Sequence, residues 1–203
     1  MSTSINGAGE ECARGRGRPR DEIARTRILE AALQLLEELG FASATTDAIA
    51  ERAGASKATI YRWWPNKAAV LIEALREAVA LENPFPDTGD LRQDLRLQLE
   101  NFVKLLTGQR GRIFKAFIAA AQSDPEVACA FRSTWIAPRR ETARAVLEKH
   151  QKHGRLSADL DPDLILDLLY GPLYFRLLAG HGPLTPDFAH AIAELALQGL
   201  SPQ

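Results

Sequence analysis

Residues 45–67, with the sequence TTDAIAERAGASKATIYRWWPNK, restrict the fold of this chain more than any other segment. Ile49 and Ala53 stand four positions apart, so they share one face of a short helix. Gly54 suits the left-handed residue that ends a helix, and Ser56 suits the capping residue that opens the next one. The segment therefore predicts two short helices joined by a tight turn.

The second of these helices has two unlike faces. Ile60 and Trp64 lie four positions apart and predict a buried seam. The opposite arc carries a small residue, a phenol and two cations, namely Lys57, Ala58, Tyr61 and Arg62. A basic, hydroxyl-bearing arc in front of a buried seam is the arrangement that a recognition helix presents to the major groove of DNA.

The flanking sequence completes a small helical domain. Apolar side chains repeat at helical spacing in 21–40, a further helix is expected at 66–81, and Thr45 or Thr46 caps the first short helix. The net charge of the whole chain is only −1, but residues 52–72 contain four basic residues and no acidic one. Because phosphate contacts are local, this placement of charge favours binding to nucleic acid.

Together these residues resemble the DNA-binding domain of the TetR family of bacterial transcriptional repressors. The match runs from about Arg25 to Leu71 and includes Gly40-Phe41, Thr45-Thr46, Ile49-Ala50, Ala53-Gly54, Ser56-Lys57, Thr59-Ile60-Tyr61 and Asn66-Lys67. The resemblance implies a homodimeric repressor that binds an inverted-repeat operator in double-stranded DNA and is released by a small-molecule effector. It implies neither enzymatic activity nor a cofactor.

The expected DNA contacts lie on and around the two short helices: Thr45, Thr46, Ser56, Lys57, Ala58, Thr59, Tyr61, Arg62, Trp63 and Lys67. Lys57 and Thr59 are the best candidates for contacts with base edges. In the resemblance, Tyr61 and Lys67 match residues that contact backbone phosphates. Trp63 departs from the family, which usually has a histidine there, and this weakens the expected contact at Trp63.

Residues 1–20 form a basic arm that is rich in Gly, Ser and Arg, and they are expected to be disordered when DNA is absent. Within the arm, Arg16-Gly17-Arg18-Pro19 resembles the core of an AT-hook, a peptide that lies in the A·T-rich minor groove. We therefore expect Arg16, Arg18 and Arg20 to contact DNA. The alternative is a solvated tail that adds only nonspecific attraction.

A boundary at 83–90, with two prolines and a glycine, separates the DNA-binding domain (21–81) from a larger C-terminal domain (82–203). Beyond the boundary the periodicity predicts helices near 90–107, 110–122, 125–153, 161–180 and 185–200. No segment alternates like a strand, so the expected fold is all-α: a three-helix DNA-binding domain and a larger helical domain, about nine helices in total.

The segment 170–178 and the amphipathic helix after it resemble one C-terminal subtype of the family. In that subtype the last two helices pair with their copies in a homodimer. The apolar stripes of both helices agree with this arrangement, since they exceed what one small domain needs. We expect the interface to contain Ile165, Leu169, Leu173, Phe188, Ile192 and Leu195. A core formed within one chain is the alternative.

The family also implies a pocket for an effector. The candidates for its wall are the large apolar residues of the C-terminal domain: Phe102, Leu106, Phe114, Phe117, Ile118, Phe131, Trp135 and Tyr174. Each of them is also an ordinary core residue. Arg110, Arg112 and Lys115 could face an anionic effector or belong to a solvated surface.

Rival functions are less well supported. His150-x-x-His153, followed by Asp159 and Asp161, has the spacing of a metal site, but no catalytic motif completes it, so we expect neither a metal nor an enzyme. An architectural DNA-binding protein without an effector would show weak sequence preference, and an activator would differ only in where its operator lies. Two cysteines, expected to be reduced, and the lack of a long apolar run favour a cytoplasmic protein without a membrane partner.

Overall fold

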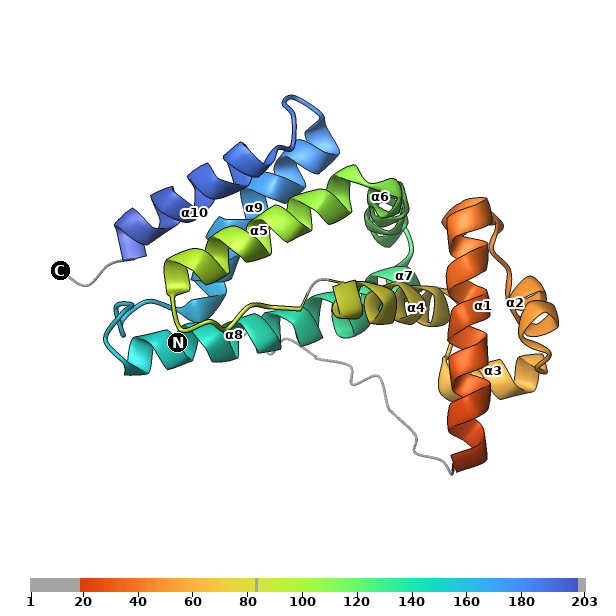
Figure 1. Cartoon of the computed structure of the whole chain (residues 1–203). Coiled ribbons are helices and arrows are strands. Elements are labelled where there is room, and N and C mark those ends of the chain that lie inside the picture. Colours follow the sequence, from red (N-terminus) through yellow and green to blue (C-terminus); the bar gives the residue numbers. More distant parts are fainter. Residues whose placement is uncertain (1–18, 83, 201–203) are drawn as a thin grey trace, which may run out of the picture.

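A computed structural model describes residues 19–82 and 84–200 of the chain. All regular structure in these residues is helical, and helices α7, η1 and α8 follow one another without a break (Figure 1). They therefore form nine separate helical segments, which confirms the expected all-α fold. The elements are α1 (Pro19–Ser43), α2 (Thr46–Ala53), α3 (Lys57–Trp63), α4 (Lys67–Glu82), α5 (Leu91–Thr107), α6 (Gln109–Ala121), α7 (Pro125–Ala130), the π-helical η1 (Phe131–Ile136), α8 (Ala137–Lys152), α9 (Pro162–Ala179) and α10 (Pro186–Leu200).

Helices α1 to α4 form the N-terminal unit, at the right of Figure 1. Helix α1 is interrupted at Gly40, whose φ of 76° lies in the left-handed region. Arg25 on α1 forms ion pairs with Glu73 and Glu77 on α4, and the indole nitrogen of Trp64 donates to Glu73 over 2.6 Å. These contacts join the residue after α3 and the N-terminal part of α1 to α4.

Helices α5 to α10 form the C-terminal unit. Helix α10 packs along α5, while α9 lies between α5 and α8 (Figure 1). The turn between α5 and α6 is very tight, since a Cβ added at Gly111 would lie 1.8 Å from the carbonyl oxygen of Leu106. This close approach requires glycine and sets the angle at which α6 crosses toward α1.

The predicted helix at 125–153 contains a feature that periodicity did not predict. Its residues 131–136 form a π-helical turn directly before α8. Pro138 follows this turn and has no N–H to continue the α-helical hydrogen-bond ladder, so the ladder changes register beside it. In the described residues, no helix is both long and apolar enough to cross a lipid bilayer.

Candidate DNA interface and effector cavity

Local hydrogen bonds determine the turn between α2 and α3. Thr45 is the N-cap of α2, and its hydroxyl accepts from the backbone N–H of Ala48 over 3.2 Å. Gly54 has a φ of 60° and ends α2, and the hydroxyl of Ser56 opens α3 by accepting from the N–H of Thr59 over 3.1 Å. The capping roles expected for Gly54 and Ser56 are therefore confirmed, and Thr45 rather than Thr46 is the cap.

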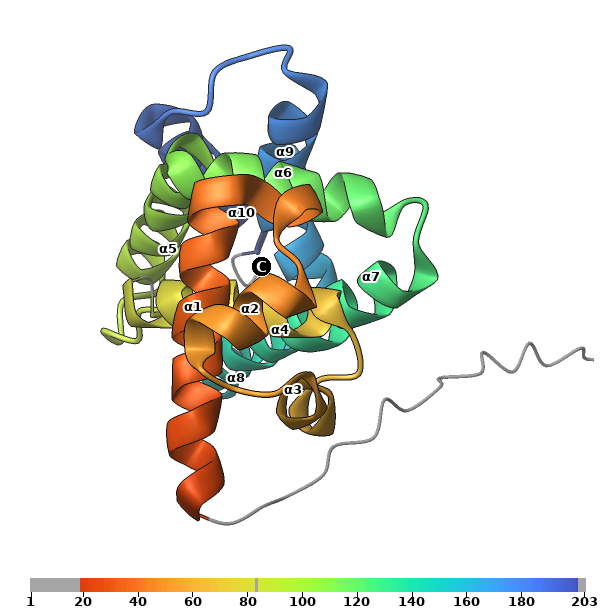
Figure 2. The same cartoon turned by 90° about the vertical axis from the view of Figure 1, so that its right-hand side faces the viewer.

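This turn presents one face of α3 away from the body of the molecule, as the view onto α1, α2 and α3 in Figure 2 shows. Ile60 and Trp64 are 0% and 3% exposed and pack inward. The outward residues are all exposed, and they are Lys57, Ala58, Tyr61 and Arg62. The two faces expected for the recognition helix are thus present in the folded chain.

The two best candidates for contacts with base edges both have partners within the chain. Lys57 forms an ion pair with Asp47 of α2, and hydrogen bonding to that carboxylate raises the pKa of Lys57. Thr59 is half-buried, and its hydroxyl shares a 2.9 Å hydrogen bond with the hydroxyl of Ser56. A base or phosphate must therefore compete with Asp47 for Lys57, whereas Thr59 offers its methyl group more readily than its hydroxyl.

The structure corrects the expectation for Trp63. The indole nitrogen of Trp63 is buried and has no hydrogen-bond partner among the described residues, so in this conformation it cannot donate to a phosphate. Trp63 packs against the hydrophobic core, and its ring is tilted against that of Trp64 with ring centres 6.3 Å apart.

Lys67 turns toward the protein. Its Nζ donates to the carbonyl oxygens of Phe41 at 3.0 Å and Ala42 at 3.3 Å, and it lies 4.8 Å from the centre of the Phe41 ring. These contacts occupy carbonyl groups in the short segment after the break at Gly40. A phosphate contact by Lys67 stays a prediction. In the basic arm, Arg16 and Arg18, like Cys12, lie outside the described residues, and Arg20 lies in the first turn of α1.

Helix α6 connects the C-terminal unit to α1. Arg110 forms an ion pair with Glu37 at 3.1 Å, and Gln109 donates to the carbonyl oxygen of Glu37 over 3.4 Å. The rings of Phe41 and Phe117 lie 4.9 Å apart. Arg110 and Phe117 thus contact the N-terminal unit, and neither lines the aromatic cavity of the C-terminal unit.

That cavity, of about 60 Å³, lies between α5, α8 and α9. Three of its lining residues were predicted, namely Phe102, Trp135 and Tyr174. Six were not: Ile136, Arg139, Arg140, Ala143, Leu166 and Tyr170. Burial raises the pKa of Tyr170 and of Tyr174, so the phenols in the wall are neutral. The cavity is aromatic with two guanidinium groups at its edge.

The other predicted wall residues lie behind this cavity or away from it. Phe114 packs on the rings of Phe102, Trp135 and Tyr174 at 4.9–6.1 Å, and Phe131 packs on Phe114. Leu106 lines a second hollow, of about 330 Å³, together with Arg112 and Lys115, and Ile118 is a core residue of α6. For Leu106, Phe114, Phe117, Ile118 and Phe131 the structure therefore gives a packing role and no place in the cavity wall. The apolar character of a residue does not by itself show whether it packs in the core or lines the cavity.

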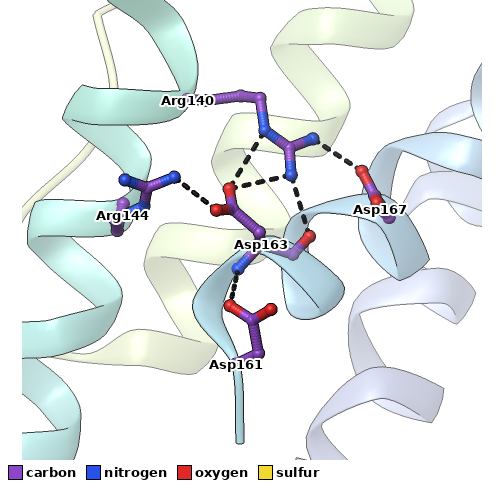
Figure 3. Close-up of polar contacts among 5 residues, drawn as sticks. All are labelled: Arg140, Arg144, Asp161, Asp163 and Asp167. Atoms are coloured by element: carbon purple, nitrogen blue, oxygen red, sulfur yellow. Dashed lines mark hydrogen bonds and ion pairs between the residues drawn. The ribbon is translucent and has the colours of Figure 1, made fainter. Parts of the chain in front are cut away.

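Arg140 at the cavity edge is held by α9, as Figure 3 shows. Its guanidinium donates to Asp163 at 2.9 Å and to Asp167 at 2.6 Å, and Arg144 forms a second ion pair with Asp163. Hydrogen bonds from Arg144 and Arg140 hold the pKa of Asp163 below its ordinary value. Asp161 caps α9 by accepting from the N–H of Asp163 over 2.9 Å. This network ties α8 to the start of α9 beside the cavity.

Helix α9 carries two apolar stripes, and the expected interface residues of this helix lie on the buried one. Ile165, Leu169 and Leu173 are at most 1% exposed, and Ile192 of α10 is 7% exposed. These side chains pack in the chain's own core, so a second copy cannot reach them. Phe188 is half-buried under the guanidinium of Arg176, at 3.3 Å from its ring centre. The exposed large apolar residues of the two helices are Leu164, Leu168, Phe175, Leu178 and Leu195, and Leu195 is among the expected interface residues.

Comparison with known proteins assigns both the N-terminal and the C-terminal unit to one family. Residues 28–74 match the family described as bacterial regulatory proteins, tetR family, and residues 85–196 match the tetracyclin repressor-like C-terminal domain. The uncharacterised HTH-type transcriptional regulator YdeS of Bacillus subtilis is 40% identical over 91% of this chain and 93% of its own length. The DNA-binding transcriptional repressor TetR of Mycobacteroides abscessus is 31% identical, over 83% and 89%.

A solved structure extends the similarity to three dimensions. The crystal structure of the TetR family transcription regulator SCO0332 superposes with a TM-score of 0.81 at 37% identity, covering 88% of this chain and 99% of that one.

Proposed function

Because this chain belongs to the tetR family of bacterial regulatory proteins and is a DNA-binding transcriptional regulator, we propose that it acts as a homodimeric repressor whose operator complex is released by a small aromatic or apolar effector. The observation that carries the proposal is the outward face of α3, where two cations and a phenol are exposed. The capping residue Ser56, the left-handed Gly54 and the buried seam hold this helix in place. A helix held in this way can enter the major groove with little loss of conformational entropy.

On DNA, Lys57 and Arg62 donate to base edges or phosphates, and Tyr61, which is 51% exposed, donates to a backbone phosphate. Ala58 keeps the helix close to the groove floor. The hydroxyl of Thr45 is used as a cap, so the start of α2 offers its remaining N–H groups to a phosphate. The basic arm adds contacts in an adjacent minor groove.

The dimer forms through the outer stripe of α9 and the neighbouring part of α10. Leu164, Leu168, Phe175 and Leu178 are between 52% and 64% exposed, and Leu195 is 69% exposed. Monomeric proteins rarely expose so many large apolar side chains on one face. A two-fold axis through this face places two α3 helices against successive major-groove segments of an inverted repeat.

The effector site is the aromatic cavity between α5, α8 and α9. At about 60 Å³ it has room for only a few water molecules, so an effector must widen it by moving α8 or α9. Helix α4 packs against η1 and α6 packs against α1, so such a movement reaches the DNA-binding unit through packed helices. An effector that binds the widened form more tightly shifts the population away from the spacing that fits DNA.

Selection of bound sequences from a random duplex library at near-physiological salt tests the proposal. We expect enrichment of an inverted repeat, with Lys57→Ala relaxing the preference at particular base pairs. Recovery of A·T-rich DNA without symmetry would favour the architectural alternative. The selected operator then serves to screen small aromatic molecules for release of DNA.

A further inference from the structure

Three ligand-type side chains meet where the segment after α4 passes between α5 and α8. They are Asp87 of that segment, Asp94 in the first turn of α5 and His150 in the last turn of α8. One carboxylate oxygen from each aspartate and one ring nitrogen of the histidine all lie within 4.8 Å of one another. Three separate parts of the chain thus bring one nitrogen and two oxygen donors to the same point.

His150 gives the independent sign that this point takes a ligand. Its side chain is 1% exposed, and neither ring nitrogen has a hydrogen-bond partner among the described residues. Asp94, at 0% exposed, is also buried beside it. Buried polar atoms are almost always hydrogen-bonded, because an unpaired buried atom loses its hydrogen bonds to water and no protein hydrogen bond offsets that cost. A histidine with two unpaired nitrogens facing two carboxylates is therefore an incomplete arrangement.

Hydrogen bonds around Asp94 hold its carboxylate in place. Asp94 accepts from the N–H of Thr88 at 2.9 Å and from its hydroxyl at 2.7 Å. Such outer hydrogen bonds orient a carboxylate as they do in metal sites.

We propose that Asp87, Asp94 and His150 bind a divalent transition-metal ion of the zinc, cobalt or nickel kind, with water in the remaining positions. An imidazole with two carboxylates is a donor set that these ions accept, whereas magnesium and calcium favour oxygen donors alone. The sequence pair His150-x-x-His153 is not this site, since His153 is exposed and its Nδ1 lies 2.6 Å from the carbonyl oxygen of Lys149.

Two cations border the site and oppose the metal. Lys149 contacts both carboxylate oxygens of Asp87 at 2.9 Å, and Arg155 donates to the carbonyl oxygen of Gly89. The metal must take Asp87 from Lys149. Replacing Lys149 with Met should therefore tighten metal binding.

The test is a titration of the full chain, without a histidine tag and after treatment with a chelator. Co²⁺ is added while its visible absorption is recorded, and Zn²⁺ is then added to displace it. We expect saturation at one ion per chain, and a loss of about tenfold or more in affinity for Asp87→Asn, Asp94→Asn and His150→Leu. His153→Gln is the matched control on the same helix and should bind like the parent chain.

Asp87 is exposed, so Asp87→Asn keeps the proposal testable even if the two buried variants fail to fold. Saturable binding that Asp87→Asn leaves unchanged, equal losses in Asp87→Asn and His153→Gln, or no saturable binding of either ion would each overturn the proposal. The titration contains no DNA, so its result is independent of the regulatory function proposed above.

Discussion

Replacing Lys67 with Met separates a structural role from a DNA contact. The ammonium group of Lys67 joins the start of α4 to the carbonyl groups of Phe41 and Ala42, which follow the break in α1. Met keeps most of the length of the side chain and its apolar stem. It removes the charge, the two hydrogen bonds and the contact with the Phe41 ring.

The size of the effect follows from these three contacts. The partly buried, charge-assisted bond to Phe41 contributes about 1.5 kcal/mol, the exposed bond to Ala42 about 0.5 kcal/mol, and the cation–π contact about 0.5 kcal/mol. We expect the free energy of unfolding to fall by about 2.5 kcal/mol, and the melting temperature by about 5–10 °C.

Urea denaturation followed by circular dichroism measures this change, and Lys104→Met is the matched control. Lys104 has a side chain that is 63% exposed, and it forms an ion pair with Glu100 one turn away, so its loss should leave the unfolding curve almost unchanged. A decrease below about 0.5 kcal/mol for Lys67→Met would refute the structural reasoning. If DNA affinity then fell equally at all sites and the salt slope dropped by about one, Lys67 would be a phosphate contact instead.

Three further substitutions test other parts of the structure. Gly111→Ala should lower the free energy of unfolding by about 2–3 kcal/mol, because the new methyl group meets the backbone of Leu106, and a thermal melt that matches the parent chain would contradict this packing. Leu168→Asp should convert the proposed dimer to a folded monomer in light scattering and abolish operator binding, whereas a dimer that persists would exclude the outer stripe of α9 as its interface. Asp163→Asn should flatten the loss of stability at acid pH: its pKa is lowered in the folded chain, so its contribution is complete above the ordinary value of 3.8 and is lost as the pH falls below it. The loss of stability is measured as the decrease in urea midpoint from pH 5 to pH 3. A decrease as large in Asp163→Asn as in the parent chain would rule out the Arg140–Asp163 network as a source of the acid sensitivity.

Short-range features of the fold were predictable because a few neighbouring residues decide them. The cap at Ser56, the left-handed Gly54 and the buried seam of Ile60 and Trp64 all appear where the sequence places them. Each depends on hydrogen bonds or side-chain periods that span at most one or two helical turns. The all-α fold and most helix boundaries follow for the same reason.

The sequence could not show which of two similar apolar faces of a helix is buried, and the tertiary structure was needed to decide it. Helix α9 is apolar on two sides, and its sequence does not reveal that Ile165 faces the chain's own core while Leu168 faces outward. That choice depends on how α5, α8 and α10 surround α9. The same holds for Phe117, which contacts Phe41 of the DNA-binding unit and lies outside the aromatic cavity.

The sequence by itself thus determined a helical regulator with a recognition helix, because helix caps and periodicity act between near neighbours. Only the tertiary structure placed His150 beside Asp87 and Asp94, turned Lys67 toward Phe41 and buried the indole nitrogen of Trp63. Each of these arrangements depends on which helices pack together. The free energy of that packing is a sum over contacts in the whole core, so no single segment of the sequence determines it.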